Sequence, residues 1–272
     1  MAPAPTGEGH AVSEQPTMRY RPPDDGIAAP EDYPNAPISI VCDRTTAGAD
    51  LFGVMVAIGG DIPLHYHSMM EFQYVISGTG LALDADGHEI PIAPGGTVLS
   101  PSGPAGAHGF RNTGVLPLTL LCVYPSPGGA TPDRSPFDTA IDPGDGPRTV
   151  YVGPADIQAA SSSASPGTTL AARIIDGLIG GAELYGEMLS IPNELARHYH
   201  PAFELLYVIA GTGVAIASDG TEMSVAPGGL ISCPAGEAGS HTLRSTGSLP
   251  LQLLSVYPAP GGDYPGRAAA PG

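Results

Sequence analysis

Six histidines and two glutamates form a pattern that occurs twice in this chain. The string HYHSMMEFQYVISGTG begins at His65 and returns as HYHPAFELLYVIAGTG at His198, and each copy is followed by a further histidine at an identical distance. Imidazole and carboxylate groups bind divalent transition metals. The duplication therefore predicts a metal site in each of two domains, with these ligands: His65, His67, Glu71 and His108 in the first, and His198, His200, Glu204 and His241 in the second.

The ligand types indicate which metal the sites would bind and which chemistry would follow. Three neutral imidazoles and one carboxylate leave two positions of an octahedral shell open, which suits Fe(II), Mn(II), Ni(II) or Co(II) better than a closed structural zinc site. We expect one divalent transition metal per domain, Fe(II) before Mn(II), Ni(II), Co(II) or Zn(II). The metal would bind a substrate oxygen and lower its pKa, and in an oxygenase it would also bind dioxygen. Glu71 and Glu204 are expected to be ligands that can instead act as catalytic general bases.

A simpler interpretation is that each HxH pair lies on the surface or is hydrogen-bonded in the core. It suits an isolated pair, but not a set that includes a carboxylate and a third histidine at fixed distances and that occurs twice. His10 lies in the N-terminal tail, and His88 lies in a turn without a histidine counterpart in the second copy. Neither is expected to bind metal.

The elements that must position these ligands are short strands. Apolar and β-branched runs such as LFGVMVAI, FQYVIS and PLTLLCVY are separated by turn sequences such as GTG, DADG and APGG, a pattern typical of an all-β sandwich or barrel. Because side chains alternate along a strand, His65 and His67 share one face. The small residues of PSGPAGAH let a distant strand bring His108 to the same pocket.

The spacing between equivalent residues predicts the domain boundaries. The offset stays at 133 residues from Asp43 and Asp176 through to Tyr124 and Tyr257, which indicates a duplication. We expect two barrels with a linker between them and a tail at each end. The expected segments are a disordered or loosely packed N-terminal tail at 1–36, barrel 1 at 37–130, a linker at 131–167 that includes a strand in RTVYVG, barrel 2 at 168–262, and a C-terminal tail at 263–272.

These motifs resemble the cupin family, and specifically the bicupins, which carry two such barrels in one chain. The first copy matches the family's two motifs with Gly59, His65, His67, Glu71, Gly78, Gly95, Pro101, Gly103, His108 and Asn112. Two more residues separate Gly103 from His108 than in the usual pattern. In the second copy, Pro192 replaces the first glycine and Ser245 the asparagine, and the matches are His198, His200, Glu204, Gly211, Gly228, Pro234, Gly236 and His241. No departure removes a ligand.

The resemblance implies an all-β fold of two tandem cupin barrels, also called double-stranded β-helices or jelly rolls. Bicupins include quercetin dioxygenases, oxalate decarboxylases, gentisate-type ring-cleaving enzymes and small isomerases. The resemblance therefore narrows the chemistry to oxygenated organic substrates held by a metal, and it leaves the reaction open.

Strand alternation also predicts which residues line the two pockets. The expected lining is Gln73, Val75, Phe110 and Asn112 in the first domain, and Leu206, Val208, Leu243 and Ser245 in the second. The second pocket is thus expected to be more apolar. The side chains of Arg111 and Arg244 are expected to point away from the pockets, because they alternate with His108 and His241. A small dianion would need an arginine beside the metal. No arginine is placed convincingly for this role, although Arg44 and Arg173 remain candidates. We therefore expect a largely neutral phenolic, enolic or polyketide-like substrate rather than oxalate.

Composition limits the partners of the chain. Its 272 residues include no lysine and ten arginines against 27 acidic residues, so the formal net charge is −17. Such a charge repels nucleic acid and anionic membranes, and the absence of lysine excludes Schiff-base chemistry on a side chain. Cys42, Cys122 and Cys233 do not correspond between the copies, which disfavours a disulfide framework. The N-terminus resembles neither a secretory signal nor a membrane span, so we expect a cytoplasmic protein. We expect a monomer or homodimer, because two barrels can cover exposed strand edges by packing on one another.

Three functions remain open at this point. We expect a dioxygenase first, with a small-molecule substrate and dioxygen as its reaction partners. A redox-neutral isomerase, cyclase or decarboxylase of a biosynthetic pathway is the second candidate. A non-catalytic metabolite-binding cupin is the third, and the ligands retained in both copies argue against it.

Overall fold

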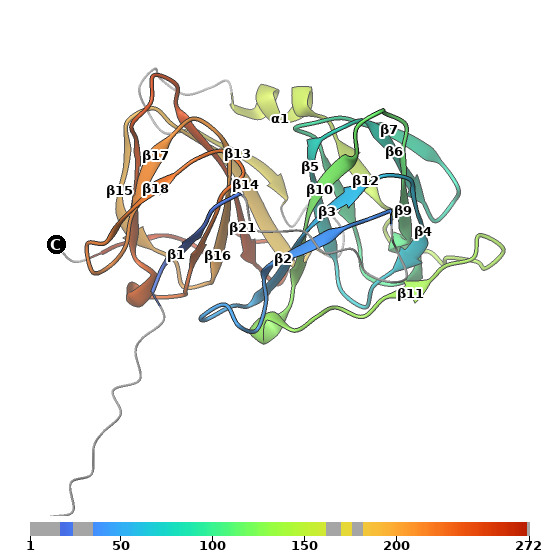
Figure 1. Cartoon of the computed structure of the whole chain (residues 1–272). Helices are drawn as coiled ribbons and strands as arrows, with labels where there is room; N and C mark the ends of the chain where they lie inside the picture. Colours follow the sequence, from blue (N-terminus) through green and yellow to red (C-terminus); the bar gives the residue numbers. More distant parts are fainter. Residues whose placement is uncertain (1–16, 24–34, 162–169, 176–181, 271–272) are drawn as a thin grey trace, which may run out of the picture.

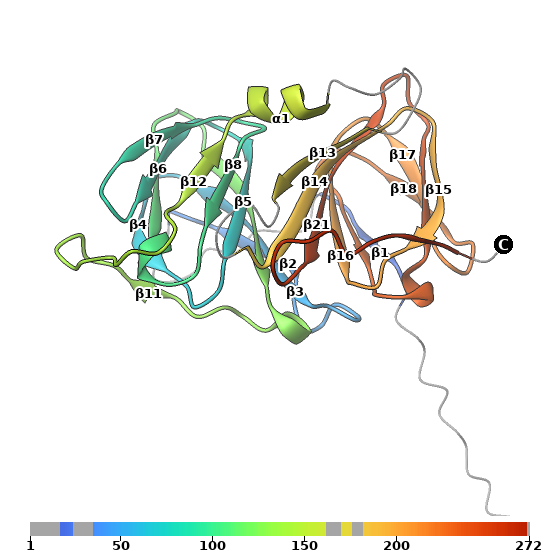
Figure 2. The ribbon, with the colours of Figure 1, turned by 180° about the vertical axis from the view of Figure 1, so that it is seen from behind.

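The chain folds into two β-barrels that lie side by side (Figure 1). The computed structural model describes residues 17–23, 35–161, 170–175 and 182–270. The all-β prediction with two tandem jelly-roll barrels is confirmed: within these residues, each barrel consists of a six-stranded and a five-stranded antiparallel sheet. Figure 2 shows the same two barrels from behind, with helix α1 (Pro154–Ser161) across their upper edge.

Barrel 1 contains the first copy of the histidine motif. Its six-stranded sheet has the order β12-β8-β5-β10-β3-β2 and its five-stranded sheet the order β11-β4-β9-β6-β7. The strands are β2 (Ile38–Cys42), β3 (Leu51–Ile58), β4 (Asp61–Tyr66), β5 (Glu71–Ser77), β6 (Gly80–Asp84), β7 (Glu89–Ile92), β8 (Thr97–Ser100), β9 (His108–Asn112), β10 (Leu118–Pro125), β11 (Ser135–Pro136) and β12 (Val150–Val152).

Barrel 2 repeats this arrangement with the second copy of the motif. Its sheets have the orders β1-β19-β16-β21-β14-β13 and β18-β17-β20-β15-β22. The strands are β1 (Arg19–Arg21), β13 (Leu170–Ile175), β14 (Leu184–Ile191), β15 (Glu194–Tyr199), β16 (Glu204–Ala210), β17 (Gly213–Ile216), β18 (Glu222–Val225), β19 (Leu230–Cys233), β20 (His241–Ser245), β21 (Leu251–Pro258) and β22 (Ala268–Ala269).

The barrels exchange their outermost strands. Strand β1 precedes barrel 1 in the chain but pairs with β19 of barrel 2, whereas β12 precedes barrel 2 but pairs with β8 of barrel 1. The Tyr20 hydroxyl accepts a hydrogen bond from Ala226 N, and the Tyr151 hydroxyl accepts one from Ala93 N, both at 3.2 Å. Each barrel edge is therefore covered by a strand from the segment ahead of the other barrel.

Glycine makes this exchange possible at the point of closest approach. A Cβ added to Gly96 would lie 2.3 Å from the Tyr151 hydroxyl, and one added to Gly229 would lie equally close to the Tyr20 hydroxyl. A larger residue at either glycine would therefore force the tyrosine ring to move. The segment 1–36, expected to be a disordered or loosely packed tail, contains the strand β1, and the expected strand in RTVYVG is β12.

Apolar side chains form the contact between the barrels. One buried cluster contains Phe72 and Tyr74 of β5 and Leu205 and Tyr207 of β16. The ring centroids of Tyr74 and Tyr207 lie 6.1 Å apart. Two further clusters fill the interiors of barrel 1 and barrel 2. Burial of these faces away from water stabilises the two-barrel unit as one body. None of the helices in the described part of the chain is long and apolar enough to cross a membrane.

Candidate metal centres

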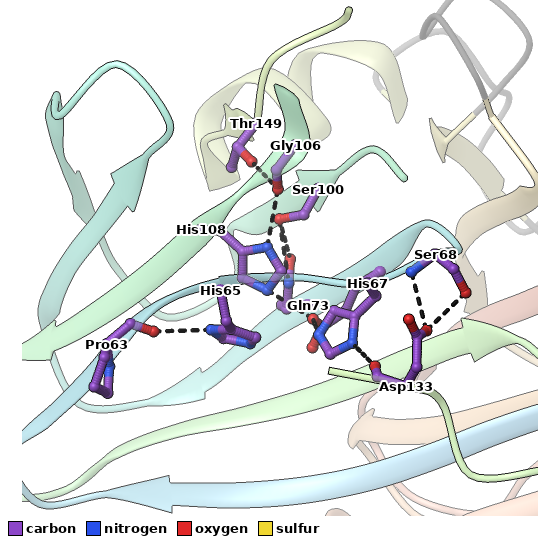
Figure 3. A network of polar contacts seen from close by, with 11 residues as sticks. Pro63, His65, His67, Ser68, Gln73, Ser100, Gly106, His108, Asp133 and Thr149 are labelled. Atoms are coloured by element: carbon purple, nitrogen blue, oxygen red, sulfur yellow. Dashed lines mark hydrogen bonds and ion pairs between the residues drawn. The ribbon is translucent and has the colours of Figure 1, made fainter. Parts of the chain in front are cut away.

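The first ligand cluster lies inside barrel 1, where three strands end close together. His65 lies on β4 and His67 directly follows it, Glu71 begins β5, and His108 begins β9 opposite His65 in the antiparallel register. One ligand atom of each residue lies within 4.8 Å of the others, and all four residues are buried. Figure 3 shows the three imidazoles facing one another.

Backbone carbonyls orient each imidazole of this cluster (Figure 3). His65 Nδ1 lies 2.9 Å from the Pro63 carbonyl, His108 Nδ1 lies 3.1 Å from the Gly106 carbonyl, and His67 Nδ1 contacts the Asp133 carbonyl. Because a carbonyl oxygen only accepts, each Nδ1 carries the proton and donates it. The Nε2 atoms therefore face the centre of the cluster, where His108 Nε2 lies 2.7 Å from Glu71 Oε2.

The second cluster, in barrel 2, is built in the same way. The Nδ1 atoms of His198, His200 and His241 lie 2.7 to 3.0 Å from the carbonyls of Ala196, Gly266 and Gly239. The ligand atoms of the three histidines lie within 4.8 Å of one another, as do those of Glu204, Cys233 and His241. All of these residues are buried.

Both clusters contain buried polar atoms that a metal would satisfy. His67 Nε2 in barrel 1, and Glu204 Oε2 and His241 Nε2 in barrel 2, have no hydrogen-bond partner among the described residues. His67 Nε2 lies 3.0 Å from Glu71 Oε2, but the two groups are not aligned as a hydrogen bond. Unpaired buried groups of this kind are costly. Two sets of three imidazoles and a carboxylate therefore fit one divalent metal per barrel.

Burial keeps one histidine of each cluster neutral, and neighbouring histidines keep Glu71 ionised. Burial lowers the pKa of His65 to about 2 and that of His198 to about 4, with smaller effects from His108 and His241 respectively. Burial alone would raise the pKa of Glu71, but the neighbouring His108 and His67 hold it well below its ordinary value. Metal binding requires neutral imidazoles and an ionised carboxylate, which His65, His198 and Glu71 supply. Burial alone would lower the pKa of His67, but its contact with Glu71 outweighs burial and raises it.

A cavity of about 350 Å³ opens beside the cluster of barrel 1. Its walls are mostly apolar, and His65, His67, Glu71, Cys122 and Tyr124 form its polar side. Thr131 and Arg134 also line it. The apolar part of the wall comprises Ala36, Ile38, Ile40, Phe52, Val54, Val56, Ile58, Ile62 and Phe110. The volume and lining are typical of a site for a small organic molecule.

The interior of barrel 2 differs sharply at equivalent positions. With the 133-residue offset, Val54 and Cys122 correspond to Glu187 and Ser255. The Ser255 hydroxyl donates to Glu204 Oε1 at 2.6 Å, and the Tyr185 hydroxyl donates to Glu187 at 3.2 Å. The prediction that the second lining is the more apolar one compared positions on β5, β9, β16 and β20. It did not consider β3 and β14, where Glu187 of barrel 2 stands at the position of Val54.

The lining residues predicted in barrel 1 lie in three different places. Phe110 lines the cavity. Gln73 is buried and donates to the Ser100 hydroxyl at 3.3 Å, and Val75 packs in the barrel core. The Asn112 amide donates to the Leu116 carbonyl in an exposed turn. Strand alternation correctly predicted that Gln73, Val75 and Phe110 point into the barrel. It did not predict that Gln73 and Val75 lie where the interior is filled by packed side chains.

The residues predicted to line the pocket of barrel 2 lie in similar surroundings. Leu206, Val208 and Leu243 are fully buried in the core of that barrel. The Ser245 hydroxyl donates to the Leu249 carbonyl at 3.2 Å in an exposed turn, as Asn112 does in barrel 1. Among the described residues, the hydrogen bonds and ion pairs of the second ligand cluster involve none of these four residues.

Sequence reasoning missed the arginine beside each cluster. Arg134 lines the cavity of barrel 1, so the expectation that no arginine is suitably placed was wrong. Arg267 lies 133 residues further on, directly after Gly266, whose carbonyl orients His200. The same offset that revealed the histidines would have revealed these arginines, had the comparison continued past Tyr124 and Tyr257. The outward orientation of Arg111 and Arg244 is confirmed by their pairing with exposed Glu89 and Glu222.

Comparison with known proteins identifies the architecture. The family model described as a cupin domain matches residues 53–124 and 188–257, more than half of the chain. No curated protein sequence matches the chain. Among solved structures, the formate complex of Lactobacillus farciminis oxalate decarboxylase is 16% identical, with 92% of this chain and 88% of that chain covered and a TM-score of 0.66.

Two further solved structures are similar over most of their lengths. Protein Ylba from E. coli is 17% identical, with 94% of this chain and 96% of that chain covered and a TM-score of 0.65. Procruciferin, an 11S globulin from Brassica napus, is 14% identical, with 90% and 85% covered and a TM-score of 0.67. At such identities the likeness shows the two-barrel fold, and the chemistry has to be argued from the site.

Proposed function

Because this chain belongs to the cupin domain family, we propose that it is a metal-dependent enzyme that transforms a small oxygenated organic compound in barrel 1. One observation carries the proposal: the imidazoles and the carboxylate of the first cluster converge on the wall of an apolar cavity of about 350 Å³. A purely structural metal site needs no such cavity beside it. We propose a cytoplasmic location for the enzyme.

The residues of each cluster would hold one divalent transition metal, with Fe(II) as the proposed ion of barrel 1. The ligands would be His65, His67, His108 and Glu71 in barrel 1, and His198, His200, His241 and Glu204 in barrel 2. When bound, such an ion supplies Lewis acidity toward a substrate oxygen and, as Fe(II), reactivity with dioxygen.

The surrounding residues of barrel 1 orient the substrate and control protons. The apolar walls hold the carbon skeleton and exclude water. Burial, followed by the charge of Glu71, raises the pKa of Tyr124 well above its ordinary value, so this phenol stays protonated. It lines the cavity and can therefore donate a hydrogen bond to a substrate oxygen. Glu71 is ionised and can accept a proton if it leaves the metal.

Dioxygenase chemistry on a phenolic or enolic compound is the reaction we propose first. The two open positions of an octahedral shell with three imidazoles and a carboxylate would leave room for one substrate oxygen and for dioxygen. Decarboxylation without net oxidation is the second candidate, favoured by Arg134 at the cavity and by the structural likeness to an oxalate decarboxylase. A non-catalytic role is the third candidate, suggested by the likeness to an 11S globulin. The two ligand clusters argue against this role.

Oxygen consumption separates these candidates. The full chain, reconstituted with Fe(II) or Mn(II), would be screened against phenolic and enolic compounds in an oxygen electrode and, in parallel, under strict anaerobiosis. We expect oxygen uptake stoichiometric with substrate loss, abolished by chelation. Turnover that continues without oxygen would favour the redox-neutral reaction, and turnover that survives exhaustive chelation would refute the metal-dependent mechanism.

A further inference from the structure

We propose that Cys233 is a further ligand of the metal in barrel 2, so that this site prefers Zn(II) whereas barrel 1 takes Fe(II). The inference names the ion of the second site, and it rests on the proposed function for the metal binding of that barrel. Its support is the position of the thiol, the unpartnered polar atoms beside it and the contrast with barrel 1.

The thiol of Cys233 lies among the ligands of barrel 2. Cys233 ends β19 and pairs with Glu204 in the antiparallel register of β16, so the two side chains share one face. The sulfur, a carboxylate oxygen of Glu204 and a ring nitrogen of His241 lie within 4.8 Å of one another, and all three residues are buried. His241 also belongs to the group of three histidines with His198 and His200. The thiol therefore adjoins the imidazole that both groups share.

Glu204 and His241 each direct a buried polar atom toward this place. Both residues are only 1% exposed, and Glu204 Oε2 and His241 Nε2 have no hydrogen-bond partner among the described residues. They lie 3.3 Å apart but cannot pair with each other in the neutral imidazole, because His241 Nδ1 donates its proton to the Gly239 carbonyl and Nε2 presents a lone pair. Two lone pairs that face one another in a buried interior are costly. A cation bound by both atoms and by the neighbouring sulfur would remove that cost.

Barrel 1 has a serine in place of this cysteine. With the 133-residue offset, Ser100 corresponds to Cys233 and Gln73 corresponds to Leu206. The Ser100 hydroxyl accepts a hydrogen bond from the Gln73 amide at 3.3 Å, whereas a leucine offers the thiol no such bond. Among the described residues, the ligand group of barrel 1 consists of three histidines and Glu71. The first site therefore offers nitrogen and oxygen, and the second offers nitrogen, oxygen and sulfur.

A sulfur ligand changes the metal preference of the second site. Thiolates select zinc among the common divalent ions, whereas Mn(II) suits oxygen ligands. The thiol would release its proton to solvent as the metal binds, so that the sulfur coordinates as a thiolate. An additional protein ligand also leaves fewer positions open to a substrate than in barrel 1, as in metal sites that stabilise a fold.

Absorption spectra of the full chain loaded with Co(II) test the sulfur ligand. Two bound equivalents of Co(II) should give the intense near-ultraviolet charge-transfer band of a bond between thiolate and Co(II). His65→Ala, with its metal in barrel 2 alone, should keep the band, and Cys233→Ser should lose it. Cys122→Ser, the matched control, removes a thiol that lines the cavity of barrel 1 and should keep the band. A band that persists in Cys233→Ser, or that is absent from the unaltered protein with two equivalents bound, would overturn the proposal.

X-ray absorption at the zinc edge tests the same ligand without a change at the cysteine. In His65→Ala loaded with Zn(II), we expect one sulfur at about 2.3 Å from the metal beside nitrogen and oxygen ligands. A shell of nitrogen and oxygen alone would overturn the proposal. The result does not depend on whether Cys233→Ser folds.

Competition between Zn(II) and Mn(II) measures the metal preference. The ratio of Zn(II) to Mn(II) affinity should be at least about tenfold higher in His65→Ala, which reports on barrel 2, than in His198→Ala, which reports on barrel 1, since even an outer-shell partner changes metal affinity by about 10–100-fold. Equal ratios would overturn the preference. These readouts need no turnover, so a sulfur ligand would stand even if no screened compound were transformed. Metal bound in barrel 2 without sulfur would refute this inference and leave the enzyme assignment intact.

Discussion

The interiors of the two barrels differ most around Glu71 and Glu204, the candidate carboxylate ligands. In barrel 1 the neighbours on β3 and β10 include Val54 and Cys122, and a cavity extends along them. In barrel 2, the hydroxyls of Ser255 and Tyr257 donate to Glu204 Oε1 at 2.6 and 2.5 Å. An identical ligand pattern thus occurs beside an apolar cavity in barrel 1 and beside a second buried carboxyl, Glu187, in barrel 2.

This difference shows how two copies of a domain can keep the same metal ligands and still differ in function. The ligand clusters are positioned by backbone carbonyls and strand register, which both barrels share. The linings depend on side chains of β3 and β14, which differ between the barrels, as Val54 and Glu187 show. We interpret barrel 1 as the site of reaction and barrel 2 as a metal site that chiefly stabilises the protein.

Loss of the ligands should have the largest effect. We expect two equivalents of metal per chain, one in His65→Ala, one in His198→Ala and none in the double variant, because each substitution removes an imidazole from a set that must displace water from the ion. Metal content after dialysis, measured by plasma mass spectrometry, checks this. Two equivalents retained in the double variant would contradict both assignments.

Removal of the hydroxyls that hold Glu204 should have the next largest effect. In metal-free protein, Tyr257→Phe should lower the free energy of unfolding by about 1–3 kcal/mol, because a buried carboxylate loses a hydrogen bond. Ser255→Ala should act in the same direction. Chemical denaturation gives the values, and Cys122→Ser, which copies the residue of barrel 2 into barrel 1, serves as the control. Equal stability of Tyr257→Phe and the unaltered protein would show that Glu204 is not held by this network.

Substitution of the tyrosines on the exchanged strands β1 and β12 should have a smaller effect on stability, each in a different barrel. Tyr20→Phe removes the acceptor for Ala226 N in barrel 2, and Tyr151→Phe removes the acceptor for Ala93 N in barrel 1. Each should cost about 0.5–1.5 kcal/mol. Hydrogen exchange should show faster exchange of Ala226 only in the first variant and of Ala93 only in the second. Faster exchange of both amides in either variant would mean that the barrels do not respond separately.

The smallest expected effect concerns Glu187 and pH. Burial, followed by the charge of Glu204, raises the pKa of Glu187. The folded protein therefore keeps this proton to a higher pH than the unfolded chain, so stability falls as the pH rises from the unfolded pKa through the folded pKa. Glu187→Gln should flatten this fall in metal-free protein, whereas Val54→Gln should not. Thermal melting between pH 4 and 8 checks the difference, and parallel curves for Glu187→Gln and the unaltered protein would exclude a raised pKa.

Much of the fold followed from the sequence because its signals are local or repeated. Turn residues between short apolar runs indicated strands, and the constant offset of the two histidine strings indicated two barrels. The exchange of β1 and β12 was not predictable in this way, since Tyr20 and Tyr151 sit in short segments and meet their glycine partners only in the folded chain.

The sequence predicted the metal ligands of the candidate site but not most of the residues that line its cavity. His65, His67, Glu71 and His108 share a motif, whereas the cavity takes residues from β2, β3, β10 and the segment 131–134, which meet only in the folded chain. Alternation indicates which face a residue occupies, but not whether that part of the interior is open or packed. Val75 illustrates this, because it points inward and lies in the core.

The division of labour between the barrels is tested most directly by the turnover of the two single-ligand variants with a substrate found in the oxygen screen. We predict that His65→Ala, with its metal in barrel 2 intact, loses at least about 100-fold of kcat/KM, the cost of removing a metal-based reaction centre. His198→Ala, with its metal in barrel 1 intact, should stay within about threefold of the unaltered protein when assayed below its unfolding temperature. Equal losses in the two variants, or the larger loss in His198→Ala, would contradict the assignment of the reaction to barrel 1.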